Sequence, residues 1–158
     1  MTKLFSLALA ATFSLAPAAC SSRDSNPLAP TIEATSFAPA LGVNLAASTR
    51  TSTGLYYRDL VAGTGTVTAR GMSLSVRYTG SLANGTQFDA SAAGSPPFTF
   101  VLGAREVIAG WDEGLVGMRV GGRRQLIIPP ALGYGANGTG PIPGNAILVF
   151  SVDVVSAR

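Results

Sequence analysis

The sequence predicts an α+β domain in which a mainly antiparallel β-sheet curves around one short α-helix. Segments with the two-residue alternation of strands recur from residue 55 to the end of the chain, and one segment has helical spacing. Strands and helices do not alternate regularly, so the βαβ units of a parallel sheet are not expected. The helix should therefore pack against a sheet of neighbouring strands.

The helical segment lies within Glu106–Leu115 and contains the only tryptophan of the chain. Ile108, Trp111 and Leu115 fall at positions i, i+3 and i+7 and form one apolar stripe, with two acidic residues off it. Gly117 follows this stripe and is a stop signal for a helix. We expect Trp111 to lie near the centre of the domain.

Six segments are predicted as strands, each bounded by turn residues. The alternation is clearest in residues 145–156, where Leu148, Phe150, Val152 and Val154 should point inward. The predicted strands are 55–61, 72–79, 87–89, 98–102, 123–128 and 145–156.

The connections between these segments are recognised by their turn chemistry. Asn84-Gly85 is a strong short hairpin signal. Residues 90–97 are small and polar with two prolines, which predicts a loop. Residues 131–145 hold five glycines and two prolines, so we expect a loop long enough to be functional.

Composition excludes several classes of function. The net charge is +3, and the arginines are scattered rather than clustered, so we expect solvated surface charges and no nucleic-acid surface. The chain has no histidine and one cysteine, which excludes metal sites built from His and Cys and any Ser-His-Asp or Cys-His catalytic unit. We expect no metal and no cofactor.

Residues 1–20 have the pattern of a secretory signal peptide, with Lys3 followed by an apolar run from Leu4 to Leu15. Two processing routes fit the small residues that follow. A signal peptidase can cut after an A-x-A sequence, whereas Ala19-Cys20 resembles the end of a bacterial lipobox, in which Cys20 is lipidated. Both predict export, either to the periplasm or to a membrane that holds the protein through its lipid anchor.

Residues 21–52 are rich in Ser, Thr, Ala and Pro and predict a flexible spacer before a folded domain at 53–158. The alternative is an N-terminal extension that packs on the domain. No dimerisation arm is recognised before the domain, so we expect a monomer.

Nine short motifs follow one another along the predicted domain. They are Val76-Arg77-Tyr78-Thr79-Gly80, Asn84–Ser91, Phe98–Gly103, Glu106–Gly114, Gly117–Gly122, Ile128-Pro129-Pro130, Tyr134-Gly135, Ile142-Pro143 and Leu148-Val149-Phe150. In these motifs and in their order, which together are specific, the domain resembles the FKBP-type peptidyl-prolyl cis-trans isomerases from about Gly54 to Ser156.

The resemblance implies an apolar pocket in which a proline-containing polypeptide, or a macrolide inhibitor of the family, binds. Trp111 would form its floor, and the Ile108 backbone N–H would bind a substrate carbonyl. The implied catalytic residues are Tyr78, Asp89, Ile108, Trp111 and Tyr134, and the implied substrate-binding residues are Phe88, Phe98, Val107, Ile142 and Phe150.

Two functions follow from this resemblance. The first is an exported isomerase that accelerates rotation of X-Pro bonds, and the second is a non-catalytic module that holds Pro-containing segments. The chain departs from the family in loop 90–97, which lacks the charged residues, typically including an arginine, that members often carry there. Asp89 must then rely on Tyr78 or on water.

Overall fold

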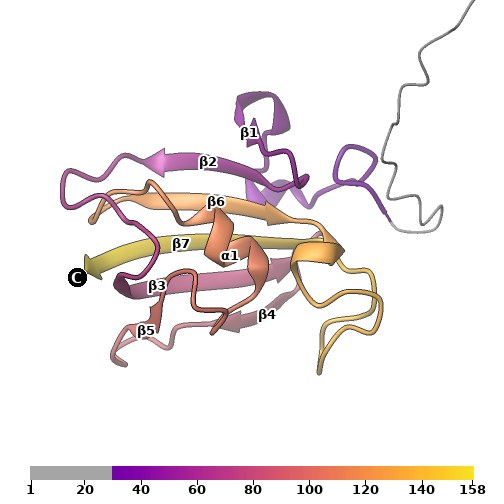
Figure 1. The fold of residues 1–158 in the computed structure, drawn as a ribbon. Coiled ribbons are helices and arrows are strands. Elements are labelled where there is room, and N and C mark those ends of the chain that lie inside the picture. The colour runs from indigo at the N-terminus through magenta and orange to yellow at the C-terminus, as the bar shows by residue number, and fades with distance from the viewer. Residues whose placement is uncertain (1–29) are drawn as a thin grey trace, which may run out of the picture.

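The computed structural model describes residues 30–158. The predicted signal peptide 1–20, the lipidation candidate Cys20 and residues 21–29 lie outside the described residues. Within 30–158, seven strands form one antiparallel sheet, and the single α-helix lies across one of its faces (Figure 1). The predicted fold class is confirmed.

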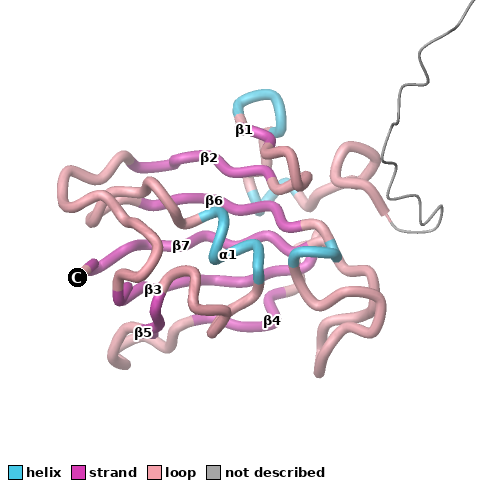
Figure 2. The backbone as a smooth tube through the Cα atoms, in the orientation of Figure 1, coloured by secondary structure: helices cyan, strands magenta, loops and turns pink. Residues whose placement is uncertain are grey.

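The sheet has the strand order β1-β2-β6-β7-β3-β4, and β5 pairs with the start of β3. Short 3₁₀ turns precede β1 and follow β6, and α1 crosses the sheet (Figure 2). The elements are β1 (Thr49–Arg50), β2 (Tyr56–Val61), β3 (Ser73–Leu82), β4 (Gln87–Ala90), β5 (Phe98–Val101), α1 (Ala109–Gly114), β6 (Arg123–Ile128) and β7 (Leu148–Ala157), with 3₁₀ turns at Pro39–Leu41, Leu45–Ala47 and Pro130–Leu132. Every predicted strand is present, and β1 is additional.

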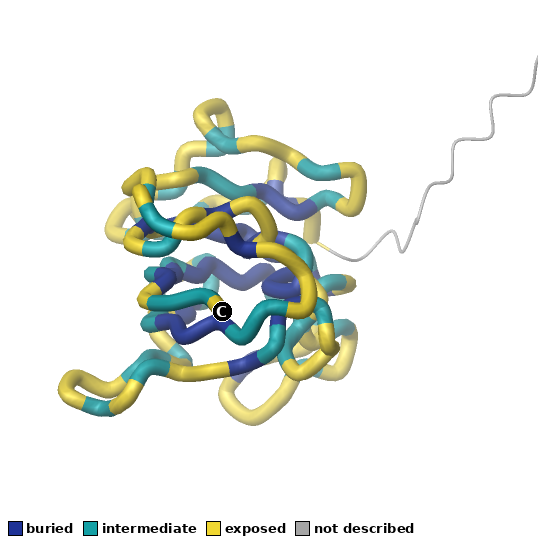
Figure 3. Tube along the Cα trace, turned by 60° about the vertical axis from the view of Figure 1, so that its left-hand side comes forward, coloured by how far each residue is buried: buried dark blue, intermediate teal, exposed yellow. Residues whose placement is uncertain are grey.

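The main core lies between α1 and the sheet. The predicted inward face of β7 is correct, since Leu148, Phe150, Val152 and Val154 are all at most 3% exposed. Leu115 closes the end of α1 and has no exposed surface. Burying each such side chain contributes about 1.5–3 kcal/mol. Buried positions are accordingly concentrated in the central strands, and exposed ones in the loops (Figure 3).

Two glycines let α1 lie directly on β6. A Cβ atom at Gly110 would stand 2.6 Å from Cγ2 of Ile128, and one at Gly114 would stand 2.7 Å from Cδ2 of Leu126. Carbon atoms in van der Waals contact are about 3.5–4.0 Å apart. Any side chain at these two positions would therefore push the helix away from the sheet.

Residues 30–52 do not form the flexible spacer that their composition predicts. Alternate residues of a strand point to opposite faces of a sheet. On β6, Leu126 and Ile128 belong to the main core, whereas Ile127 belongs to a second cluster with Ile32 and Tyr56. The segment 32–50, here called the N-terminal strap, therefore covers the face opposite α1.

Hydrogen bonds tie the strap to the sheet at several places. The Ala38 N–H donates to the carbonyl of Ala83 at 2.9 Å, next to the β3–β4 hairpin. Gln125 Nε2 donates to the carbonyl of Leu41 at 2.7 Å. Composition misled the prediction here, because a few spaced apolar residues were enough to cover one sheet face. Phe37, Leu41, Val43 and Leu45 all pack against the second cluster.

Arg124 is an exception to the expectation that the arginines are solvated surface charges. Its side chain is 6% exposed and makes two hydrogen bonds to Asp59, of 2.7 and 3.0 Å. It also donates to the carbonyls of Gly114 and Val116 at the end of α1. Arginine is suited to this role because its planar guanidinium can satisfy several acceptors at once.

Within residues 30–158, no helix is long and apolar enough to cross a membrane.

We predict that the strap contributes to the stability of the domain. Ile32 is 2% exposed, so Ile32→Ala should lower the free energy of unfolding by about 2–4 kcal/mol. Urea denaturation checks this. The matched control is Leu60→Ala on β2, since Leu60 is 41% exposed and its loss should change stability by less than about 0.5 kcal/mol. Equal effects of the two variants would contradict the packing of the strap.

Candidate functional site

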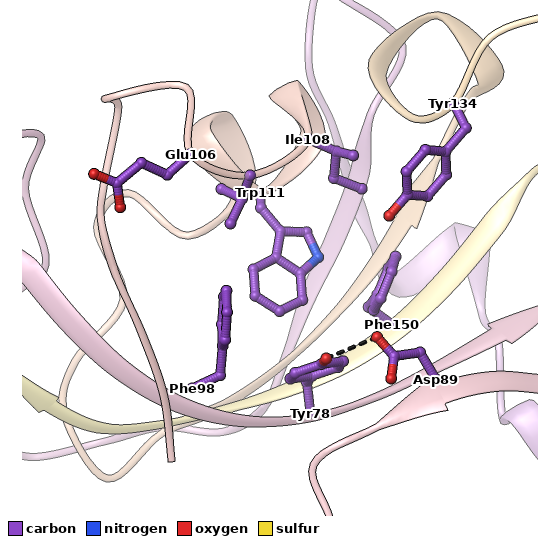
Figure 4. Close-up of a pocket in the computed structure, with 9 residues that line it drawn as sticks. Tyr78, Asp89, Phe98, Glu106, Ile108, Trp111, Tyr134 and Phe150 are labelled. Carbon is purple, nitrogen blue, oxygen red and sulfur yellow. Dashed lines mark hydrogen bonds between the residues drawn. The ribbon is translucent and has the colours of Figure 1, made fainter. Parts of the chain in front are cut away.

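A cavity of about 260 Å³ opens between α1, the sheet and the loop after β6 (Figure 4). Five of its nine lining residues are aromatic. The lining residues are Tyr78, Asp89, Phe98, Glu106, Val107, Ile108, Trp111, Tyr134 and Phe150. They come from distant parts of the chain, and the curved sheet brings them together.

Trp111 forms the floor of this cavity. It is 4% exposed, and its ring centroid lies 5.1 Å from that of Tyr78, 5.3 Å from Phe150 and 5.7 Å from Phe100. The contacts with Tyr78 and Phe150 are edge-to-face, the arrangement that aromatic quadrupoles favour. The floor is therefore rigid as well as apolar.

The indole nitrogen of Trp111 is buried and has no hydrogen-bond partner among residues 30–158. Figure 4 shows it on the side of the ring that faces Ile108 and Tyr134. A buried N–H without an acceptor is costly. The described residues therefore leave this donor both buried and unpaired.

Asp89 is the carboxylate on the β4 side of the cavity, and the Tyr78 hydroxyl donates to its Oδ2 at 2.7 Å (Figure 4). Burial, together with this bond and the nearby negative charge, raises the pKa of Tyr78 to about 12. The phenol therefore stays protonated at neutral pH and keeps donating. Asp89 has no ion pair among residues 30–158, so Tyr78 supplies its hydrogen-bond partner.

Tyr134 reaches over the cavity from the loop after β6. It is 38% exposed, and Figure 4 shows its hydroxyl directed toward the interior of the site. Burial and the charge of Asp89 raise the pKa of Tyr134. The site thus holds two neutral phenols and one carboxylate on this side.

Ile108 precedes α1 and has an extended backbone, with φ −60° and ψ 148°. Its carbonyl accepts from the N–H groups of Trp111 and Asp112, but its own N–H has no acceptor among residues 30–158. The first N–H groups of a helix lack partners within the helix. A ligand carbonyl in the cavity could accept from Ile108.

Loop 90–97 has no charged residue, and hydrogen bonds to residues of β3 hold it in place. Ser91 Oγ accepts from the Tyr78 N–H at 3.0 Å, and the Ser91 N–H donates to the Tyr78 carbonyl at 2.9 Å. Arg77 on β3 donates through Nη2 to the Ser95 carbonyl at 2.9 Å. These bonds fix the loop next to the residue that binds Asp89.

Eight of the ten residues singled out from the sequence line the cavity, and two do not. Phe88 is half-buried, with its ring centroid 5.5 Å from that of Phe150. Ile142 is 5% exposed and belongs to the main core. Both pack close to the cavity, and their contact with substrate stays a prediction.

Two acidic residues were not singled out as site residues. Glu106 lines the cavity and accepts from the Val101 N–H at 3.0 Å. Asp112 is 7% exposed and accepts from the N–H groups of Gly103 and Arg105, at 2.7 and 3.0 Å. The position of Asp112 next to Trp111 in the predicted helix was the available signal for this loop anchor.

The residues that line the cavity are suited to binding a ligand. Among residues 30–158, no three His, Cys, Asp or Glu side chains lie close enough to hold a metal ion. The lining side chains offer apolar faces, and Ile108 offers a backbone N–H donor. This combination suits an apolar ring joined to a carbonyl group, without an attacking nucleophile.

Comparisons with known proteins agree on one family. Residues 65–155 match the profile of the FKBP-type peptidyl-prolyl cis-trans isomerases. An FK506-binding protein of Neisseria meningitidis is 48% identical over 65% of this chain and 94% of its own length. FK506-binding protein 4 of Dictyostelium discoideum is 51% identical over 65% of this chain, which spans only 28% of that longer protein.

Solved structures give the same result. FkpA of Escherichia coli has a TM-score of 0.65 and 38% sequence identity, over 71% of this chain and 52% of that chain. AtFKBP13 has a TM-score of 0.66 and 35% identity, over 70% of this chain and 98% of that chain.

We predict that the tyrosines of the site make the protein sensitive to alkali. Tyr78 has a pKa of about 12 in the folded protein and about 10 when unfolded. Its contribution to stability is therefore complete below about pH 10 and is lost as the pH rises toward 12. Urea denaturation between pH 8 and about 11.5 should show a shallower alkaline loss of stability for Tyr78→Phe than for the wild type. Identical losses would show that Tyr78 titrates normally.

Proposed function

This chain belongs to the FKBP-type peptidyl-prolyl cis-trans isomerases and is an isomerase of that type; we propose that its reaction runs in the cavity floored by Trp111. The observation that carries this proposal is that cavity itself, in which an aromatic floor, two unpartnered N–H donors and the Tyr78–Asp89 pair meet. The substrate would be an X-Pro bond of a polypeptide.

The barrier to this reaction comes from amide resonance. An X-Pro bond prefers trans by only about 0.5–1 kcal/mol, but the rotation barrier is about 18–20 kcal/mol, so the bond isomerises in tens to hundreds of seconds. Water stabilises the planar, charge-separated amide. An apolar cavity that excludes water favours the twisted and less polar transition state.

We assign roles to the lining residues on this basis. The proline ring would stack on Trp111 between Phe98 and Phe150, which line the cavity beside it. A neighbouring backbone carbonyl of the substrate, outside the rotating amide, would accept from the Ile108 N–H and hold the chain in place. Only interactions that are stronger in the twisted form than in the planar form lower the barrier. A thousandfold acceleration requires about 4 kcal/mol.

The Tyr78–Asp89 pair would keep the polar wall fixed while the amide twists. Asp89 accepts from Tyr78 and carries its charge near Tyr134. The phenol held in this way stays directed toward Asp89. Tyr134 would close the cavity on its open side.

We further propose that the protein is exported and anchored to a membrane through Cys20. Support comes from the signal-like residues 1–20 and from Cys20 as the only thiol of the chain. The strap begins at Ile32, so twelve peptide units separate it from Cys20. At about 3.3–3.6 Å per residue, the strap would begin within about 43 Å of the anchor.

The second candidate is a monomeric binding module that holds Pro-containing segments in the same cavity without turnover. The neutral loop 90–97 favours it, since no arginine of that loop reaches Asp89. Relatives named as FK506-binding proteins support macrolide binding in either case.

We predict that the purified protein accelerates cis-to-trans relaxation of a short X-Pro peptide and that a macrolide of the FK506 type inhibits it. Trp111→Leu should lower kcat/KM at least tenfold, because the proline loses its aromatic floor. Thermal unfolding of the same variant separates lost catalysis from lost folding. Relaxation no faster than in buffer at micromolar protein would leave only the binding module.

We predict that the mature protein carries acyl chains on Cys20. Mass spectrometry of protein isolated from membranes should then show an N-terminal peptide that begins at lipidated Cys20. In a Cys20→Ser variant the protein should move to the soluble fraction. An unmodified N-terminus at Ala19 would rule the anchor out.

A further inference from the structure

A second cavity, of about 480 Å³, adjoins the isomerase cavity. Val107 lines both, so the two meet at this residue. Arg70, from the turn before β3, and Arg105, from the loop between β5 and α1, line the second cavity. We call it the arginine cavity.

The two guanidinium groups of this cavity have no partner within the described part of the chain. The ion pairs of residues 30–158 use Arg50, Arg123 and Arg124 instead. Neither the Arg70 nor the Arg105 side chain donates a hydrogen bond within that range, and both residues are exposed. Each guanidinium has five N–H donors available to a ligand.

The arginines are held at the cavity by their surroundings. Arg70 lies over Gly103, where a Cβ atom would stand 3.1 Å from Cγ and 3.2 Å from Nη1 of Arg70. Arg105 has a left-handed backbone, with φ 62°, and its N–H donates to Asp112. The buried carboxylate thus fixes the backbone from which the Arg105 side chain departs.

Both carboxylates that line this cavity are already engaged. Asp112 accepts from the backbone N–H groups of Gly103 and Arg105. The two oxygens of Glu113 lie 2.7 and 2.9 Å from the Thr53 hydroxyl that donates to them. The two arginines and the two carboxylates that line the cavity have a formal net charge of zero. An anion would therefore be recognised through direct hydrogen bonds to the arginines rather than by long-range attraction.

We propose that the arginine cavity binds an acidic side chain, Asp or Glu, that lies close to the proline in the substrate polypeptide. A carboxylate matches the planar fork of a guanidinium and can accept two parallel hydrogen bonds from it. A chain whose proline occupies the isomerase cavity would reach the arginines over Val107. This inference rests on the isomerase function proposed above and specifies the sequences on which the enzyme acts best.

The test compares short X-Pro peptides that differ only by Glu or Gln at one position, placed one, two or three residues before or after the proline. At the matching position, kcat/KM of the full-length protein should be about two- to fivefold higher for Glu, as expected for an exposed ion pair. The ratio should fall to about one in the Arg70→Gln, Arg105→Gln double variant. It should persist in Arg119→Gln, which faces a different cavity.

A Glu-to-Gln ratio of one at every position in the wild type, or a ratio that survives in the double variant, would overturn the proposal. Peptide binding, followed through the fluorescence of the single tryptophan, separates this result from failure of the isomerase function. In one outcome neither peptide is turned over, while the Glu peptide still binds more tightly than the Gln peptide and loses this advantage in the double variant. That result would support acid recognition by the arginine cavity and contradict the isomerase function. Equal binding of the two peptides counts against it.

Discussion

The close contact between α1 and β6 determines where the rest of the site lies. Gly110 and Gly114 face Ile128 and Leu126 at distances that leave no room for a side chain. With the helix so close to the sheet, Trp111 projects from between these glycines into the concave side of the sheet. Arg124 then fixes the end of the helix by donating to its last carbonyls. The position of the Trp111 ring therefore depends on the lack of side chains at Gly110 and Gly114. It also depends on the buried guanidinium of Arg124.

The aromatic residues around Trp111 serve stability and function together. Phe100 and Phe150 are at most 3% exposed and fill the core, while Phe98 is 43% exposed and leaves one side of the ring cluster open. A cavity with such a lining offers little solvation to a polar amide. Its polar elements are few and fixed, since Asp89 is held by Tyr78 and the donor of Ile108 lies on a rigid turn. Rate enhancement by such a site would come from shape and desolvation, with no proton transferred.

The sequence was most informative where local pattern and burial agree. The alternation of β7 and the helical stripe of Trp111 and Leu115 correctly placed the core, and motif order correctly identified the family. The packed strap was only the alternative to a flexible spacer, because its apolar residues have no period. Their burial depends on the apolar sheet face to which Ile127 belongs. Arg124 was missed because its acceptors on Asp59 and α1 are distant in sequence. No local pattern could indicate which of the aromatic and aliphatic residues near Trp111 line the cavity and which, like Ile142, belong to the core.

If the enzyme rotates an amide by binding its twisted form, it needs no acid–base chemistry. The solvent isotope effect on kcat/KM for a short X-Pro peptide, measured in H₂O and D₂O at equivalent acidity, distinguishes the two mechanisms. We expect equal rates in the two solvents, because no proton moves in the transition state. A rate that falls severalfold in D₂O would exclude catalysis by binding alone and would require a proton donor or acceptor among the residues of the cavity.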